Sequence, residues 1–561
     1  MFLQKIKFIL IIFILYQTPL YSKSSSFNNY SSKNLSKYFS GIVAFENKDS
    51  KKALNFFRSS KGLIHKHDLY LKRYIYSLVS ENKILQAIDI IKQNKGKDNS
   101  KFLDAYFLLI IDSLKKRDLD QANKYLLDAI NFTDKDRFDI AILETLKQFI
   151  FVFKENKISN TKKNFGKLSN ISETFQRCYL EDPHTEKYFS NLINDKDGNF
   201  ERYIYFYLSF LIEQNRTQEA KIIANDIKYI NTTILLLQGK SWIEKQKIEK
   251  FNKIFSCKNH NDLIGEFFFI ISNLYSSEDN FIKSNFFLNL SNYLNPKFIF
   301  NLSLIAENQF LNGEFKKAKK TLKNFKKEDD FYYWYRIKKE AQIIEKQRNK
   351  KESLNYIMEE FKKIDNPNNK ILFDIANFNK NSEKYMDSIK FYSKIINTLD
   401  YKDNIKSNLL YRRGGSYERI GEYAKADKDF FDSLKIDPDD AYVLNYLAYS
   451  WLERQYKIDE AMEMLKRAYS VRNNDPYIID SIGWAYYLVK DYTKAEKHLK
   501  RAVELMPDDP IVNDHYGDIL WKLNRKIQAR YFWTNVLTMD DTEDEMREKV
   551  NIKIIEGLKK S

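Results

Sequence analysis

Histidine and cysteine side chains are the first candidates for chemistry, because they ligate metals and serve as bases or nucleophiles. Two short clusters have ligand-like spacing, His65-x-His67 and Cys257-x-x-His260. A zinc site needs a second ligand pair at a suitable distance, and neither cluster has one. We therefore expect no metal site and no cofactor. We interpret the six histidines as solvated surface residues: His65, His67, His184, His260, His498 and His515.

Longer catalytic motifs are also missing from the sequence. It contains no G-x-S-x-G, H-E-x-x-H, Walker loop or G-x-G-x-x-G. Carboxylate pairs such as Asp508-Asp509 precede predicted helices, where capping explains them. The sequence therefore predicts a protein that is not an enzyme. A competing hypothesis is an envelope hydrolase or transferase that uses the carboxylates of residues 140–262.

The only two cysteines, Cys178 and Cys257, are 79 residues apart. A disulfide between them is one option in an oxidising compartment. Nothing in the sequence shows that they meet, so we favour two buried free thiols.

The first 22 residues have the pattern of a secretory signal. Lys5 and Lys7 supply a positive start, an apolar run covers residues 8–16, and Pro19 ends it. Nine residues are too few to span a bilayer about 30 Å thick. We expect an exported protein, periplasmic or associated with the cell envelope. An uncleaved anchor is the alternative.

The elements that position the remaining residues are helices. Glycine and proline are scarce, at 14 and 8 of 561 residues, whereas hydrophobic residues make up 43% of the chain. Tight turns are therefore few and a folded helical protein is expected. A repeat is visible, because four small residues stand 34, 35 and 34 positions apart: Gly414, Ala448, Gly483 and Gly517. Each is followed 12 or 13 residues later by an alanine: Ala426, Ala461, Ala495 and Ala529.

Such a pattern predicts helical hairpins, since two antiparallel helices approach closely only where both contribute a small side chain. The same phase continues towards the amino terminus through weaker residues. These are Ser272, Ala306, Ala341 and Ala376, opposite Ser284, Ala318, Ser353 and Ser388, and, further back, Gly41 with Ala53, followed by Ala87 and Ala122.

This register resembles the tetratricopeptide repeat (TPR), W-x2-L-G-x2-Y…A-x3-F…P. The best copy runs from Ser481 to Tyr487 and continues through Ala495, Leu499 and Pro507. The resemblance implies an all-α fold, a right-handed TPR superhelix.

Three stretches, residues 445–451, 480–487 and 513–518, also resemble long exported TPR adaptors of the proteobacterial envelope. That resemblance implies a partner protein, such as an envelope protease or a cell-wall enzyme.

We predict five segments. They are a signal peptide (1–22), amino-terminal TPR-like repeats (23–139), an irregular helical region (140–262), an array of about eight repeats (263–541) and a capping helix (542–561).

The predicted partner-binding surface is the face of the first helices that remains after the packing positions are assigned. It combines aromatic anchors with carboxylates and an amide, as protein interfaces do. The alternative is that the aromatic residues fill space between units. The strip comprises Tyr442, Asn445, Tyr449, Tyr477, Asp480, Trp484, Tyr487, Asp514, Asp518 and Trp521, with Ile511 beside it.

The net charge of +17 is concentrated in part in a Lys-rich stretch, residues 311–351. We interpret it as a solvated convex face. Peripheral contact with anionic lipid or lipopolysaccharide is the alternative, and no nucleic-acid partner is expected. The lysines are Lys316, Lys317, Lys319, Lys320, Lys323 and Lys326.

Overall fold

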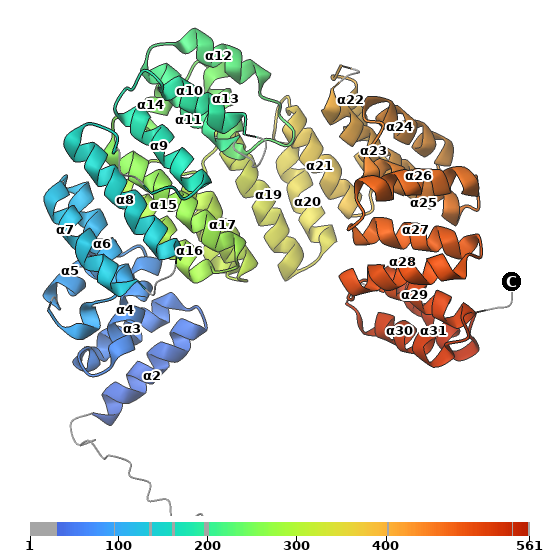
Figure 1. The fold of residues 1–561 in the computed structure, drawn as a ribbon, viewed down its shortest axis with the longest axis horizontal. Coiled ribbons are helices and arrows are strands. Elements are labelled where there is room, and N and C mark those ends of the chain that lie inside the picture. The colour runs from blue at the N-terminus through green and yellow to red at the C-terminus, as the bar shows by residue number, and fades with distance from the viewer. Residues whose placement is uncertain are drawn as a thin grey trace, which may run out of the picture. The chain divides into compact units, whose positions relative to one another are not determined.

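The computed structural model describes residues 31–94, 96–133, 137–159, 163–195, 201–400, 403–540 and 542–558. The predicted signal peptide lies outside these residues. In the described residues the regular secondary structure consists of helices alone (Figure 1). The all-α fold predicted from the sequence is therefore confirmed.

Helix starts follow from capping residues. The Asp440 carboxylate accepts hydrogen bonds from the backbone N–H groups of Tyr442 and Val443, at 2.9 and 3.2 Å, where α25 begins. Asp475 and Asp509 cap the next two first helices in the same way, and each is followed by a proline at the first helical position. Proline fits there because its missing N–H has no intrahelical partner to lose.

Helical hairpins form where the repeat pattern places small residues. All eight small pairs predicted between residues 272 and 529 are buried, and so are Gly41, Ala53, Ala87 and Ala122. In one hairpin the Ser353 hydroxyl donates to the backbone carbonyl of Ala341 at 2.8 Å, so the two helices touch at these positions.

The chain divides into two compact units. The first runs to Arg336 without residues 228–231, and the second contains residues 228–231 and 337–561. This division does not coincide with the predicted boundaries at 139, 262 and 541, which remain predictions. The helix α19 (Asp330–Gln347) crosses the division.

Among its described residues, the first unit has seventeen α-helices besides the start of α19, and three short 3-10 helices. The α-helices are α2 (Ser32–Glu46), α3 (Ser50–Ser59), α4 (Asp68–Ser80), α5 (Ile84–Gln93), α6 (Leu103–Lys115), α7 (Leu119–Ala129), α8 (Arg137–Glu155), α9 (Lys167–Tyr179), α10 (Thr185–Ile193), α11 (Arg202–Glu213), α12 (Thr217–Asp226), α13 (Ile234–Glu244), α14 (Glu249–Ile254), α15 (His260–Ser277), α16 (Phe281–Leu294), α17 (Asn301–Leu311) and α18 (Phe315–Leu322).

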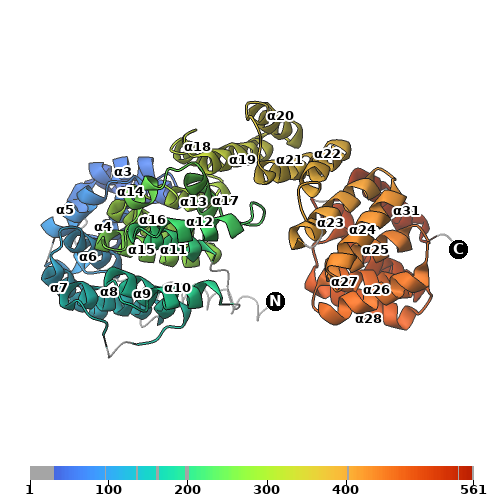
Figure 2. The same cartoon turned by 90° about the horizontal axis from the view of Figure 1, so that it is seen from above.

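Within this unit, α15 and α16 pack against the much earlier helices α4, α6 and α8 (Figure 2). Aromatic rings make the contact: Phe107 lies 5.5 Å from Phe287 and Tyr76 lies 5.0 Å from Phe286, measured between ring centroids. The unit therefore uses its own later helices to cover the inner side of its earlier repeats.

A disulfide joins Cys178 of α9 to Cys257, which precedes α15, with their Cα atoms 5.6 Å apart. Both cysteines are buried. The prediction of two free thiols was wrong, because the packing of α9 against α15 brings together residues that are distant in sequence.

The second unit is a series of helical pairs ended by one further helix, α31, which packs on α30. Its helices after α19 are α20 (Lys350–Phe361), α21 (Asn369–Asn381), α22 (Tyr385–Ile396), α23 (Asn404–Arg419), α24 (Tyr423–Ile436), α25 (Ala441–Glu453), α26 (Ile458–Val471), α27 (Pro476–Leu488), α28 (Tyr492–Leu505), α29 (Pro510–Lys522), α30 (Lys526–Thr538) and α31 (Asp544–Glu556).

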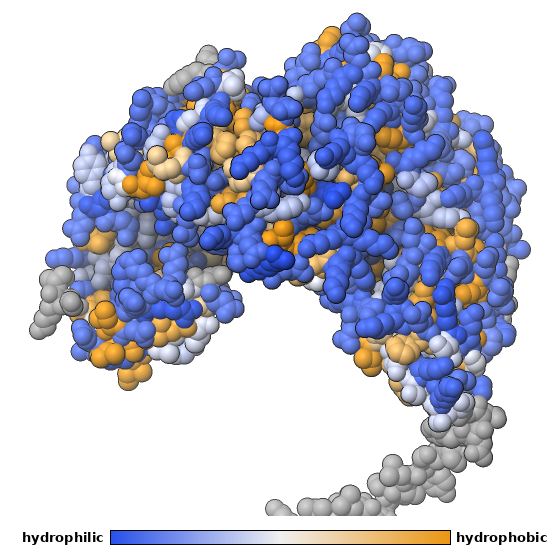
Figure 3. Space-filling view, turned by 180° about the vertical axis from the view of Figure 1, so that it is seen from behind, coloured by the Kyte–Doolittle hydropathy of each residue, from blue (hydrophilic) through white to orange (hydrophobic). Residues whose placement is uncertain are grey.

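The face of the molecule drawn in Figure 3 is mainly polar. Hydrophilic residues predominate on it and hydrophobic ones form scattered patches. Within the described ranges, none of the helices has both the length and the apolar character needed to cross a membrane.

Candidate functional site

Three first helices of the second unit, α25, α27 and α29, lie side by side and bring aromatic rings together. The Trp484 ring is stacked between two others, 4.1 Å from His515 and 4.6 Å from Tyr487, measured between centroids. Tyr449 also lies near His515, with 6.4 Å between the ring centroids. We call Tyr449, Trp484, Tyr487 and His515 the ring stack. Three of its members belong to the predicted strip.

His515 is the member that sequence reasoning missed. Its Nδ1 lies 2.9 Å from the Asp480 carboxylate, and both side chains are buried. Burial by itself would lower the pKa of His515, but Asp480, Asp514 and Asp518 outweigh it and raise that pKa. The interpretation of His515 as a solvated residue was wrong. Its place next to Asp514, the repeat equivalent of Asp480, is the signal that could have identified it.

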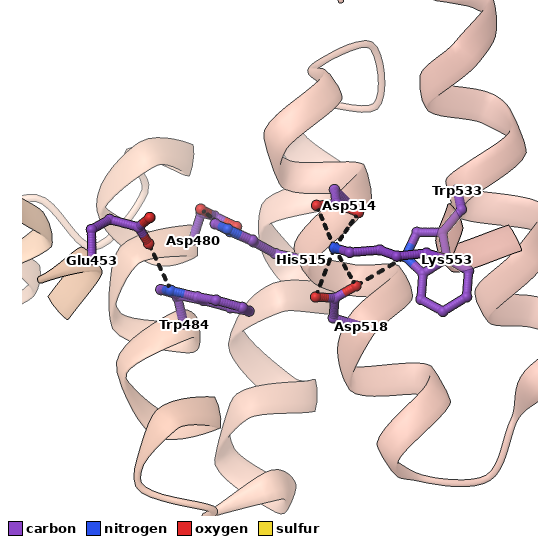
Figure 4. Close-up of polar contacts among 8 residues, drawn as sticks. All are labelled: Glu453, Asp480, Trp484, Asp514, His515, Asp518, Trp533 and Lys553. Carbon is purple, nitrogen blue, oxygen red and sulfur yellow. Dashed lines mark hydrogen bonds and ion pairs between the residues drawn. The ribbon is translucent and has the colours of Figure 1, made fainter. Parts of the chain in front are cut away.

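The other two carboxylates of the strip are held by the last helix. Lys553 of α31 donates to Asp514 at 2.7 and 2.8 Å and to Asp518 at 2.8 and 2.9 Å (Figure 4). The Trp533 indole N–H also donates to Asp518, at 3.0 Å. Burial first, and Asp514 second, raise the pKa of Asp518. Asp480 and Asp518 therefore bind other side chains of the same chain.

The exposed part of the predicted strip is aromatic. Tyr442 is 44% exposed and Tyr477 is 53% exposed, and they stand in the first turns of α25 and α27. Asn445 is half-buried one turn further along α25. The Trp484 indole N–H donates to Glu453 at 3.2 Å, which fixes the ring orientation. The exposed tyrosines and the rigidly held rings therefore lie on the same first helices, about two turns apart.

Trp521 lies apart from the ring stack, at the end of α29. Its ring lies 5.4 Å from Trp533, measured between centroids, and the Arg530 guanidinium lies 4.9 Å from its ring centroid. It is half-buried. Trp521 therefore packs between α29 and α30, the two helices of its own unit, and these contacts do not join it to an adjacent unit.

The histidine and cysteine clusters have other partners. His67 Nδ1 is hydrogen-bonded to Tyr38 at 2.8 Å, and His65 Nε2 lies 2.9 Å from the Lys97 amine. His260 is half-buried and donates to the Leu114 carbonyl at 2.8 Å, so it is not a solvated residue. Across the part of the chain that the structure describes, no three His, Cys, Asp or Glu side chains converge as metal ligands would.

Carboxylates between residues 140 and 262 form ion pairs. Arg177 binds Glu173 at 2.7 Å and Asp182 at 2.9 Å. Arg216 likewise binds Glu186 and Glu219. These contacts link neighbouring helices and turns, which is a structural role.

The Lys-rich stretch is largely exposed, as expected of a solvated face, and part of it lines a groove. Lys316, Lys320, Lys323 and Lys326 are exposed and Lys317 is half-buried. All of these except Lys316 line a groove of the first unit. The turn after α2 faces α18 across this groove, and the Lys317 amine donates to the backbone carbonyl of Lys48 at 2.8 Å.

Comparisons with known proteins agree with the repeat pattern. A 111-residue segment is 33% identical to the TPR repeat-containing protein PA4667 of Pseudomonas aeruginosa, and it covers 20% of this chain and 19% of that relative. The chain is similar to tetratricopeptide-repeat proteins. An 86-residue match to protein bimA of Emericella nidulans, at 26% identity, covers 15% of this chain and 11% of bimA. The match thus spans about a fifth or less of these relatives.

Solved TPR-containing structures are also similar to the chain. The TPR protein TTC0263 of Thermus thermophilus is 16% identical, with a TM-score of 0.29, and the match covers 33% of this chain and 97% of that one. MamA of Desulfovibrio magneticus RS-1 is 18% identical, with a TM-score of 0.26, over 31% of this chain and 97% of that one. No protein-family model matches the chain.

Proposed function

We propose that this chain is a non-enzymatic scaffold that binds a partner protein through the surface around the ring stack. TPR repeats present adjacent first helices as one continuous surface, which suits the recognition of a peptide or helix. The observation that carries the proposal is the placement of exposed Tyr442 and Tyr477 in the first turns of α25 and α27, the helices that carry Tyr449 and Trp484 of the ring stack about two turns later.

The energetics of such a surface favour binding. Tyrosine and tryptophan bury large areas on association and lose little rotamer freedom, so they dominate the free energy of many interfaces. The ring stack is held by the bonds of His515 to Asp480 and of Trp484 to Glu453, so little ordering remains to be done when a partner arrives.

We also propose that the protein works outside the cytoplasm, in the periplasm or at the envelope, with an envelope protease or a cell-wall enzyme as partner. The disulfide between Cys178 and Cys257 supports this location, because such bonds persist in oxidising compartments. Fusion of residues 1–30 to a reporter that is active only after export should give signal. A silent reporter would count against export.

Site-specific cross-linking in the native cell tests partner binding. A photoreactive phenylalanine analogue replaces Tyr477 on α27 or, as a control, Tyr531 on the second helix α30, which is 65% exposed. We expect one discrete cross-linked protein from position 477 and none from position 531, identified by mass spectrometry. Equal products from both positions would contradict a binding surface at the ring stack.

A further inference from the structure

The first unit contains a groove that the ring stack does not involve. It has a volume of about 540 Å³ and lies between the turns after α2 and α4 on one side and α16, α17 and α18 on the other. Residues more than 200 positions apart build it: the Lys48 amine bonds the Asn312 side chain, and the Lys317 amine bonds the Lys48 carbonyl, across 264 and 269 residues. The groove is therefore a product of the fold of this unit.

One wall of the groove is a row of amides on α16. Asn285, Asn289 and Asn292 line it, and their spacing of four and three residues puts them on one helix face. The Asn285 carbonyl oxygen Oδ1 accepts from buried Asn308 at 3.0 Å, so its Nδ2 group is left to donate to a ligand. Asn289 uses its Nδ2 to donate to the Asn285 backbone carbonyl at 2.7 Å, so its Oδ1 is left to accept.

A donor and an acceptor thus stand one helical turn apart, with Cβ atoms about 5–6 Å from each other. An extended polypeptide backbone presents the matching groups, because every residue other than proline carries one N–H and one C=O. Ser50, Ser80 and Thr321 add hydroxyl groups to the lining.

The charge of the groove is positive. Five lysines line it, Lys48, Lys317, Lys320, Lys323 and Lys326, against two carboxylates, Glu81 and Glu314. Glu314 already pairs with Lys317, at 3.3 Å. A ligand with carboxylates is therefore attracted, and one with amines is repelled.

We propose that this groove binds an extended acidic segment of a partner polypeptide. The amide row pairs with the backbone of the segment, and the lysines of α18 and the following turn pair with its carboxylates. This site is separate from the ring stack, so the proposal can be tested independently of the partner proposed to bind there.

Fluorescence anisotropy with the full chain and a fluorescein-labelled decaglutamate peptide tests the proposal. The double variant Lys320→Glu and Lys323→Glu reverses two groove charges. The matched control, Lys157→Glu and Lys253→Glu, makes the same change of net charge at two exposed lysines of the same unit outside the groove. We expect the groove variant to weaken binding by about tenfold or more and the control by less than about twofold.

A third variant tests the amide row. Asn292→Asp keeps the shape of the half-buried Asn292 side chain and adds one negative charge inside the groove. We expect weaker decaglutamate binding and an unchanged circular dichroism spectrum. Variants of the exposed tyrosines of the second unit, Tyr442 or Tyr477, should bind the peptide normally.

Three outcomes would overturn the proposal. Wild-type protein that does not bind decaglutamate excludes the ligand class. If the groove variant and the control variant weaken peptide binding equally, the peptide is attracted by the overall positive charge of the protein and not by the groove. Binding of phosphatidylglycerol vesicles, lost in the groove variant, together with no peptide binding, assigns the groove to a lipid surface instead.

Discussion

A Cβ atom added at Gly483 of α27 would lie 2.8 Å from the Leu499 side chain of α28 and 3.1 Å from the Leu499 backbone nitrogen. The same register joins Gly414 to Phe430 and Gly517 to Trp533, where the added atom would lie 2.8 and 2.4 Å from the partner ring. The small residue of each first helix is therefore required by the approach of the second.

Gly483→Ala should destabilise the protein by about 1–3 kcal/mol, because the Leu499 side chain must move and the backbone of α28 beside it must give way slightly. In an ordinary helix interior the same change stabilises by about 0.5–1 kcal/mol. Gly415→Ala is the matched control, since the nearest atoms to its added Cβ lie at 3.4 Å or more. Circular dichroism melts of both variants measure the difference. Equal melting temperatures would show that Gly483 is not a packing contact.

The disulfide should contribute measurably to stability. Replacing both Cys178 and Cys257 by serine removes a cross-link over 79 residues, for which an unfolded-state effect of roughly 2–4 kcal/mol is typical. The melting temperature of the first unit should fall to the same value in the variant and in reduced wild-type protein. Titratable thiols in unreduced, denatured wild-type protein would contradict the bond.

Lys553 should stabilise the carboxyl-terminal repeat. Lys553→Met leaves Asp514 and Asp518 without their counter-charge in a buried site, which should cost about 3 kcal/mol. Adding Asp518→Asn should recover part of that loss. Lys549→Met, one turn earlier on α31 and paired only with exposed Glu545, is the control and should change stability little. Chemical denaturation of the four proteins measures these differences, and equal losses for both lysines would contradict the account.

His515 should make stability depend on pH. Its pKa in the folded protein is raised above the usual 6.5, so protonated His515 stabilises the fold. That contribution is complete below pH 6.5 and is lost as the pH rises through the folded pKa. The melting temperature of wild type minus that of His515→Gln should therefore be larger at pH 5.5 than at pH 9. A difference that does not change with pH would mean that His515 stays neutral.

Local pattern was enough to predict the hairpins, because one small pair per unit decides how closely two helices approach. The sequence alone therefore predicts that Gly483 packs against the second helix of its unit. It did not locate contacts between distant residues. The Cys178–Cys257 bond, the burial of His515 and the groove between Lys48 and Lys317 all depend on how separate hairpins pack together.

The strip stays a prediction as a partner-binding surface, and local pattern could place only some of its side chains. The 3-4-3 spacing identified Tyr442, Tyr477 and Trp484 on the first helices. It could not show that Asp518 is bound by Lys553, since α31 lies outside the repeat register. The aromatic residues of the strip recur with the repeat. The carboxylates Asp514 and Asp518 are neutralised by Lys553 of α31, a helix that is not part of the repeat.

The central claim is tested most directly by purifying the partner found by cross-linking and measuring its affinity for two double variants of this chain. Tyr442→Ala with Tyr477→Ala removes the exposed rings in the first turns of α25 and α27. Tyr423→Ala with Tyr531→Ala removes two exposed tyrosines, 42% and 65% exposed, from second helices. The account predicts that the first pair weakens binding by about 30-fold, or about 2 kcal/mol, while the second changes it less than about twofold and both melt as wild type does. Normal binding by the first pair, or equal loss in both, would contradict it.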